Sequence, residues 1–267
     1  MLKNNITPYI IALSVAFLSS CTSDKSQDSN TSSEDQQTEI SRNLFSTTVT
    51  QFIIRAFYEA GAEPYTGAIG ISGNDTWDIS KTSFESLFQD HAGRTITTPS
   101  VVSDMTAFTD QNVSSWTASQ LVTLGDSLAP ALVSGNTAEV AIIFVNGQFN
   151  GSAATLGVHI SGTRFAFVFK DVVLSVGGSD TSQKYVEQAT VVHEIGHTIG
   201  FVNNGVPLQT NHEDESHPHH TTNEDGVMYW AVESTSGVLT FLTDIITGGQ
   251  LNLFGPETLQ DGRSHKP

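Results

Sequence analysis

Val191-Val192-His193-Glu194-Ile195-Gly196-His197 is the most informative stretch of this 267-residue sequence. It lies inside a predicted helix that is capped near Asp180 or Thr181 and runs through Ile199 to Gly200. One helical turn places His193 and His197 on the same face, where their imidazoles can share a metal ion. Glu194 lies beside them, positioned to take a proton from a metal-bound water molecule rather than to bind the metal itself.

Three features of the sequence around this stretch favour a metal site over a chance match. Val192, Ile195 and Ile199 are available to a hydrophobic core, as expected for an amphipathic helix. Gly200 follows three residues after His197, where a helix can end in a left-handed turn. Six of the nine histidines lie between positions 193 and 220, which a single buried structural histidine does not require.

A tetrahedral catalytic zinc takes a third protein ligand and leaves one position for water. His193-Glu194-x-x-His197-x-x-Gly200 resembles the metzincin metallopeptidases, whose motif continues with a histidine or aspartate at the position held here by Asn203. Neutral asparagine is a poor zinc ligand. Further on, His220-Thr221-x4-Gly226-Val227-Met228 resembles the archaemetzincin branch with both cysteines replaced. The resemblance implies an insertion after Gly200 and His220 as the third ligand of Zn²⁺.

The same resemblance implies two further consequences for the loop after the helix. Thr221 and Gly226 stand where archaemetzincins use cysteines for a second, structural zinc, so that site is not expected here. Met228 would form the apolar floor beneath the catalytic zinc. Other loop residues remain open as alternative ligands, as does their interpretation as a solvated polar loop: His212, Asp214, His217 and His219.

The body of the chain predicts an α+β fold. Candidate strands span 49–58, 94–102, 138–145, 155–160 and 164–169, and candidate helices span 78–88, 115–129, 180–200 and 239–246. Metzincin resemblance implies a mixed, mostly parallel sheet, an active-site helix and a loop-rich C-terminal subdomain. It also places 155–160 at an exposed sheet edge that pairs with an extended peptide. A single domain of 44–267 is the simplest division.

The first 43 residues predict export and anchoring. Residues 1–21 combine a basic Lys3 with an apolar stretch too short to span a bilayer, which indicates a signal peptide. Leu18-Ser19-Ser20-Cys21 resembles the bacterial lipobox, which implies lipid attachment to Cys21. Residues 22–43 are polar and predict a disordered tether. We therefore expect a protein lipid-anchored in the bacterial cell envelope, at the outer membrane, with the exposed face undetermined.

Composition narrows the classes of partner. The formal net charge is −17, with 28 acidic and 11 basic residues, so phosphate backbones are repelled and nucleic acid is not an expected partner. Cys21 is the only cysteine, which excludes an intrachain disulfide and a thiolate zinc ligand in the mature chain. We expect a monomer that acts on protein or peptide substrates.

The residues favour one function over two alternatives. The first is a zinc-dependent endopeptidase, with His193, His197 and His220 as ligands and Glu194 as base and then acid. The second is a non-catalytic envelope lipoprotein that binds zinc through the 212–220 loop. The third is an inactive protein on a peptidase-like fold, because Asn203 departs from the metzincin pattern.

Overall fold

A mixed sheet forms the centre of the computed structural model, which describes residues 32–70, 73–91 and 93–267. The main sheet runs in the order β2-β1-β6-β9-β8, and β3 and β5 pair with β1 and β6. Pairs β1–β2, β1–β3, β1–β6 and β6–β9 are parallel, whereas β8–β9 and β5–β6 are antiparallel. The predicted mixed, mostly parallel sheet of an α+β fold is confirmed.

The elements have the following bounds. The strands are β1 Gln51–Glu59, β2 Thr95–Thr97, β3 Thr106–Phe108, β4 Ser115–Trp116, β5 Val133–Ser134, β6 Thr137–Val145, β7 Gln148–Phe149, β8 Gly157–His159 and β9 Phe165–Phe169. The helices are α1 Ser33–Phe45, α2 Asp78–Leu87, α3 Ala118–Leu128, α4 Lys170–Ser175, α5 Asp180–Ile199, α6 Thr235–Gly248 and α7 Pro256–Ser264, with short 3₁₀ turns η1 Val102–Asp104 and η2 Trp230–Glu233.

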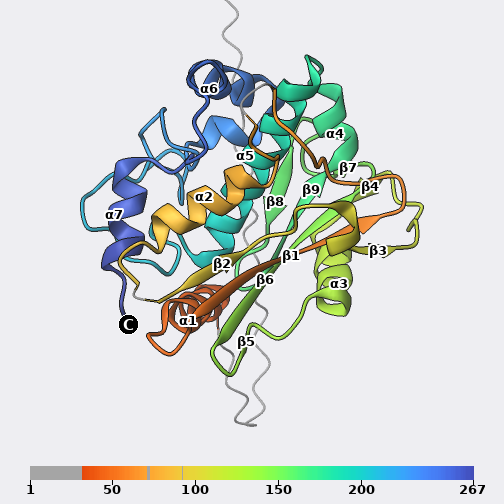
Figure 1. Ribbon diagram of the computed structural model, residues 1–267. Coiled ribbons are helices and arrows are strands. Elements are labelled where there is room, and N and C mark those ends of the chain that lie inside the picture. Colours follow the sequence, from red (N-terminus) through yellow and green to blue (C-terminus); the bar gives the residue numbers. More distant parts are fainter. Residues whose placement is uncertain (1–31, 71–72, 92) are drawn as a thin grey trace, which may run out of the picture. The chain divides into compact units, whose positions relative to one another are not determined.

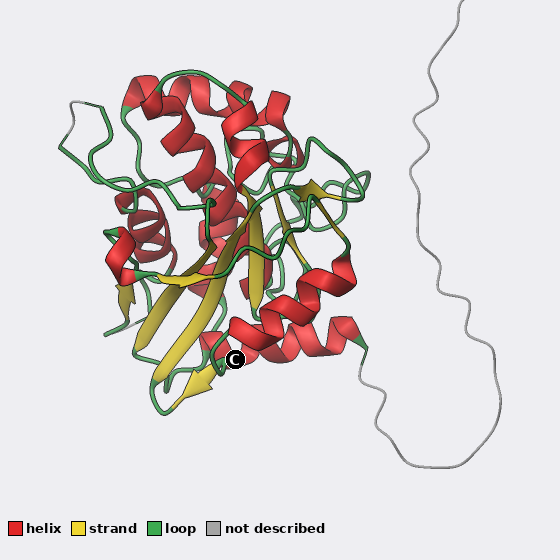
Figure 2. Ribbon diagram, turned by 90° about the vertical axis from the view of Figure 1, so that its right-hand side faces the viewer, coloured by secondary structure: helices red, strands yellow, loops and turns green. Residues whose placement is uncertain are grey.

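Strand β9 and the 140–145 part of β6 are apolar, as expected for strands with helices on both faces. Every residue of β9 is buried, and β6 is buried continuously from Val140 to Val145. Helix α5 contacts β9, β8 and β6, and α3 packs on β9. Figure 1 shows α2 and α5 to one side of the sheet and α3 to the other, and Figure 2 shows helices on both sides of the strands.

Helix α5 carries the quoted motif and has well-defined ends. Its N-cap is Ser179, one residue before the predicted start, and the Ser179 side chain accepts a hydrogen bond from the backbone N–H of Ser182. Gly200 ends the helix with a φ of 100°, the predicted left-handed turn. A Cβ at Gly200 would lie 2.0 Å from the Ser41 hydroxyl oxygen, so glycine also permits α1 to approach.

Helix α1 corrects the prediction of a disordered tether over 22–43. Residues 33–43 are helical, and Gln37, Ile40, Ser41 and Leu44 are buried. The compact unit accordingly includes the described residues from Ser32 onward, instead of beginning at 44. The prediction was wrong because the segment contains few apolar residues, but its buried face is completed by polar groups that bond the end of α5.

The C-terminal third also differs from the prediction at several points. Helix α6 starts at Thr235, earlier than predicted, and a further helix, α7, follows it. Helix α3 is capped by Thr117, whereas Ser115, the first residue of the predicted helix over 115–129, lies in β4. Residues 201–229 are largely irregular, as expected for a loop-rich region.

Two predictions concern the N-terminal residues. The signal peptide of 1–21, with its lipidated Cys21, and residues 22–31 of the tether lie outside the described residues. Within the part of the chain that is described, no helix combines the length and hydropathy that crossing a membrane requires.

Candidate metal centre

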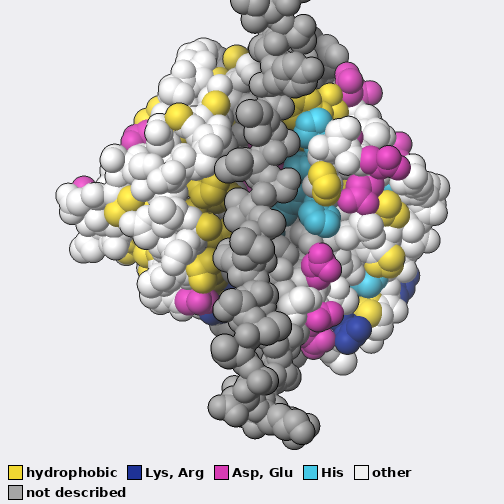
Figure 3. Space-filling model, turned by 180° about the vertical axis from the view of Figure 1, so that it is seen from behind, with side chains coloured by type: hydrophobic (Ala, Val, Ile, Leu, Met, Phe, Trp, Pro, Cys, Tyr) yellow, Lys and Arg dark blue, Asp and Glu magenta, His cyan; other side chains and the backbone are white. Residues whose placement is uncertain are grey.

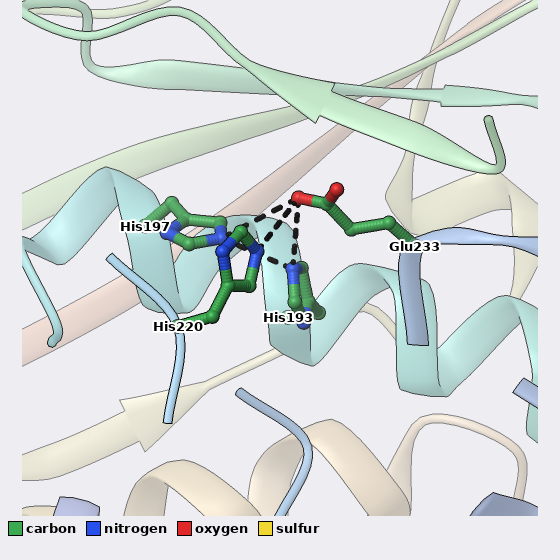
Figure 4. A group of neighbouring side chains, drawn as sticks. All are labelled: His193, His197, His220 and Glu233. Atoms are coloured by element: carbon green, nitrogen blue, oxygen red, sulfur yellow. Dashed lines mark hydrogen bonds and ion pairs between the residues drawn. The ribbon is translucent and has the colours of Figure 1, made fainter. Parts of the chain in front are cut away.

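Three imidazoles converge on one point beside α5 (Figure 4). His193 and His197 project from the same side of this helix, and their Nε2 atoms lie 3.0 Å apart. His220 comes from the loop, with its ring 5.3 Å from that of His193 and 4.8 Å from that of His197, measured between centroids. The three residues predicted as ligands are thus brought together, two by helical phase and one by the tertiary fold.

A fourth residue, Glu233, completes the group and was missed in the sequence. Its Oε1 lies 2.9 Å from His220 Nε2, 3.3 Å from His193 Nε2 and 3.8 Å from His197 Nε2. The four ligand atoms all fall within 4.8 Å of one another. The sequence does hold a weak signal, since Ser234 caps the helix after the Met228 turn and so places Glu233 next to it.

The geometry of this group fits Zn²⁺. Zinc bonds imidazole nitrogen and carboxylate oxygen at about 2.0–2.2 Å, so atoms at neighbouring corners of a tetrahedron lie about 3.3–3.5 Å apart. The separations of 2.9 to 3.8 Å between Glu233 Oε1 and the three Nε2 atoms bracket that range. Three neutral imidazoles and one carboxylate are also a donor set that suits zinc.

Backbone carbonyl groups fix the orientation of two of the rings. His193 Nδ1 donates to the Val227 carbonyl at 2.6 Å, and His220 Nδ1 donates to the Pro218 carbonyl at 3.1 Å. Because each Nδ1 carries the proton, each Nε2 presents its lone pair to the shared point. The carbonyls therefore select the tautomer that a metal ligand needs.

Burial and the neighbouring groups both shift the pKa values in the group, and for two residues they act in opposite directions. Desolvation, together with His193 and His220, holds the pKa of His197 well below its usual value. Burial also lowers the pKa of His220, but the hydrogen bond and charge of Glu233 outweigh it and raise that pKa overall. Burial opposes ionisation of Glu233, yet its bonds to His193 and His220 hold its pKa well below the usual range.

Glu194 lies next to this group in a dry environment. Burial, and after it the charge of Glu233, raises the pKa of Glu194 well above its usual value, whereas the backbone N–H of His159 opposes the shift. Its Oε1 is buried without a hydrogen-bond partner in the described part of the chain. A Cβ at Gly157 would lie 2.7 Å from Glu194 Cγ, so the glycine in β8 makes room for this side chain.

Met228 packs against the helical turn that bears the two histidines. The side chain is fully buried, and its sulfur would lie 2.4 Å from a Cβ at Gly196. Because Gly196 has no side chain, the Met228 side chain can approach the helix closely. This is the position expected of an apolar floor; its role toward a metal stays a prediction.

His212, an alternative ligand in the sequence, points elsewhere. Its Nε2 lies 2.7 Å from Asp261 Oδ2, and its Nδ1 lies 3.0 Å from the Thr221 hydroxyl. Asp261, in α7, also accepts a hydrogen bond from the backbone of Gln209. All three members of this relay, Asp261–His212–Thr221, are buried. Both ring nitrogens are occupied, so His212 ties the C-terminal helix to the residue after His220.

The remaining alternative ligands also lie outside the group of four. Asp214 bonds His217 Nδ1 at 2.8 Å, and the His217 ring stacks on Trp230 with centroids 4.2 Å apart. His219 Nδ1 lies 3.3 Å from the Val202 carbonyl. Figure 3 shows histidine side chains gathered on one face with acidic side chains beside them. The side chains of Asp214, His217 and His219 therefore each have a partner outside the group of four.

Asn203 occupies the position where the metzincin pattern has its third ligand. Its Nδ2 donates to Glu213 Oε2 at 3.0 Å, so the amide serves the loop and not the metal group. Its φ of 60° lies in the left-handed region, which asparagine tolerates better than most residues. Asn203 is thus accounted for by the turn after Gly200.

Comparisons with known proteins give weak likenesses. No protein family and no curated protein matches the sequence. Among solved structures, the archaemetzincin from Archaeoglobus fulgidus complexed with malonate is 12% identical, with a TM-score of 0.41 over 79% of this chain and 99% of that one. The archaemetzincin from Methanopyrus kandleri is 12% identical, with a TM-score of 0.43 over 82% and 97%.

A zinc-dependent peptidase from Methanocorpusculum labreanum is 15% identical, with a TM-score of 0.37 over 66% of this chain and 87% of that one. Identities and TM-scores this low do not establish a family. A function for this chain has to be argued from its own site. The group of His193, His197, His220 and Glu233 fits zinc by its own geometry and donor set.

Proposed function

We propose that this chain is a zinc-dependent endopeptidase in which Glu194 acts first as the general base and then as the general acid. The observation that supports it most is the convergence of three imidazole Nε2 atoms, with a buried and unpartnered carboxylate oxygen of Glu194 beside them. Zinc storage needs the imidazoles alone. Hydrolysis also needs a base next to the metal that is not itself a ligand.

In this proposal each residue has one task. His193, His197 and His220 would hold the zinc. When bound, zinc polarises a peptide carbonyl and lowers the pKa of a water molecule toward neutrality. Glu194 accepts the proton of that water at Oε1 and returns it to the leaving amine.

The edge strand β8 would bind the substrate. It ends the main sheet and pairs only with β9, antiparallel, among the named strands. An extended peptide could add to its free side through backbone hydrogen bonds. N-methylation of one substrate amide that bonds β8 should lower kcat/KM about tenfold, since one hydrogen bond is lost. Equal cleavage of peptides methylated at every position near the scissile bond would contradict pairing at β8.

A second candidate is a zinc-binding protein without catalysis. It is favoured by Glu233, because four protein ligands are typical of closed, structural zinc sites. This site differs from the 212–220 loop that the sequence indicated for such a function.

Zinc content and peptide cleavage by the wild type and Glu194→Ala separate the two candidates. Retained zinc with cleavage lost only in the variant supports the peptidase. Stoichiometric zinc with no cleavage by either protein favours the non-catalytic binder.

We also propose that the protein is held at the bacterial envelope by a lipid on Cys21, as its lipobox-like sequence indicates. Incorporation of labelled palmitate by the wild type, and its loss with release of the protein in Cys21→Ala, is the expected result. Labelling that persists in the variant would refute the anchor.

A further inference from the structure

Residues 231–235, termed here the closing segment, connect the metal centre with the sheet edge. The Glu233 carboxylate reaches all three histidines, as described above. The backbone of the same segment lies along the residues that lead into β8: Leu156 N–H donates to the Glu233 carbonyl at 2.9 Å, and Thr235 N–H donates to the Ala154 carbonyl at 3.3 Å. A β-bridge between Thr155 and Ser234 lies between these bonds.

These contacts occupy two positions that a peptide substrate would require, the sheet edge and the metal. A peptide adding to β8 would use backbone groups along this edge, and those of Ala154 and Leu156 are already paired with the closing segment. A peptide carbonyl and a water molecule would also need the metal position that Glu233 Oε1 now faces. The chain thus places one of its own carboxylates and one of its own backbone segments where a bound peptide would lie.

The backbone of the closing segment is held in place, whereas its carboxylate has room to leave. Val232 is fully buried, and Ser234 caps α6 by accepting a hydrogen bond from Gly237 N–H at 3.2 Å. The Glu233 side chain, by contrast, is 39% exposed, against 1% for His193 and 12% for His220. A change of side-chain rotamer could therefore take the carboxylate into solvent without moving the backbone.

We propose that Glu233 is a displaceable fourth zinc ligand, which closes the site at rest and is replaced at the metal by an incoming substrate. This inference rests on the proposed function. It resolves the conflict between a fourth protein ligand and a catalytic zinc that needs an open position. Substrate binding then has to compete with an internal carboxylate, so the resting enzyme is restrained by its own chain.

The test compares the full chain with Glu233→Ala and Glu233→Gln, using Glu224→Ala as a control that removes an exposed carboxylate from the same region. Zinc affinity is measured by competition with a chelator. Acetohydroxamate serves as a metal-binding probe of the fourth position in the zinc-loaded protein. Visible absorption of the cobalt-substituted protein reports the coordination directly, and circular dichroism checks that each variant is folded.

Removing the carboxylate should weaken zinc binding and strengthen probe binding. We expect roughly tenfold weaker zinc affinity and roughly tenfold tighter acetohydroxamate affinity in Glu233→Ala than in the wild type, with Glu224→Ala unchanged. Glu233→Gln should behave similarly, because its amide keeps the shape but is a poor ligand. The cobalt spectrum should change in both Glu233 variants and not in the control.

The outcomes separate this inference from the proposed function. Zinc binding with cleavage, but equal acetohydroxamate affinity and equal cobalt spectra in the wild type and both variants, overturns the role of Glu233 alone. Stoichiometric zinc with the expected Glu233 effects, but no cleavage by the wild type or Glu233→Ala, overturns the peptidase alone. Absence of zinc binding by the folded wild type overturns both.

Discussion

Helix α5 and the loop of 201–229 both contribute to the metal centre, but they position their histidines by different means. On α5, one helical turn and two capped ends fix His193 and His197. In the loop, His220 depends on contacts with distant parts of the chain. Thr221 N–H bonds the Met228 carbonyl, and its hydroxyl faces the His212–Asp261 pair. Ligands on a helix thus depend on local geometry, whereas a loop ligand depends on the whole fold.

The largest expected difference is between two histidines of these regions. His197→Ala removes a buried ligand on α5 and should weaken zinc binding by more than about a hundredfold, since loss of a direct ligand exceeds the effects of outer contacts. His219→Ala, in the loop but outside the group of four, should leave zinc affinity within about twofold. Zinc content and chelator competition measure both. Equal losses in the two variants would place the metal somewhere else.

A second prediction separates catalysis from metal binding on the side of α5 that faces β8. Gly157→Ala puts a methyl group 2.7 Å from Glu194 Cγ, closer than carbon atoms normally approach, so the Glu194 side chain must shift. Cleavage should fall about ten- to a hundredfold, because misplacement of a catalytic group by about 1 Å is costly. Zinc affinity should stay unchanged, because the atoms nearest to the new methyl group belong to Glu194, Thr190 and Phe167 and to none of the four metal-facing residues.

Gly248→Ala is the matched control, since a Cβ there meets only an ordinary contact at 3.7 Å in an exposed part of α6. Thermal unfolding shows whether Gly157→Ala has damaged the sheet, because its methyl group would also approach Thr190. Undiminished kcat/KM in a folded Gly157→Ala protein would show that the position of Glu194 does not matter to the reaction.

The same contrast explains which parts of the site could be predicted from the sequence. The shared face of His193 and His197 follows from helical period, with Glu194 beside them, whereas His220 was implied only by the resemblance of its spacing from Met228 to the archaemetzincin pattern. Glu233 lies on a 3₁₀ turn with no periodic pattern, and the only signal for it in the sequence is its nearness to a helix start. His212 could not be excluded as a metal ligand from the sequence, because its hydrogen-bond partner Asp261 lies 49 positions away.

A third prediction tests how the loop is held. Asp261→Asn replaces an ionic acceptor of His212 and weakens the relay that ends at Thr221, the neighbour of His220. We expect the free energy of unfolding to fall by about 2 kcal/mol, the range for a buried hydrogen bond to a charged group, and zinc affinity to fall about tenfold as the loop loosens. Calorimetry and chelator competition measure the two effects.

Gln260→Ala, an exposed neighbour in α7, is the control for general damage to that helix. Unchanged zinc affinity in Asp261→Asn, with the expected loss of stability, would mean that the relay stabilises the C-terminal region but does not position His220. Hydrogen exchange of the backbone amides of 212–222 measures the order of the loop directly. A global loss of stability would lower protection throughout the protein, whereas a loosened loop would lower it only in this segment.

Helix α1 also shows why part of the fold could not be predicted from the sequence. Its start carries a recognisable capping box, in which Ser32 and Asp35 bond each other's backbone N–H groups, and Ile40 and Leu44 are four residues apart on one face. Polar composition nevertheless indicated a tether. What composition cannot reveal is that Gln37 and Ser41 bond the last carbonyl groups of α5, so polar residues can form a buried face.

The smallest expected effect concerns this contact. Gln37 Nε2 donates to the Thr198 carbonyl at 2.9 Å, and its Oε1 accepts from Gly162 N–H at 3.0 Å. Gln37→Ala should lower the free energy of unfolding by about 1–2 kcal/mol, because buried backbone groups lose their partners, while exposed Gln36→Ala should change it little. Zinc affinity should hardly change, since helical geometry alone keeps His193 and His197 in phase. A large loss of zinc affinity in Gln37→Ala would mean that His193 and His197 also depend on distant contacts. The loop would then differ from α5 only in how strongly its histidine depends on the rest of the fold.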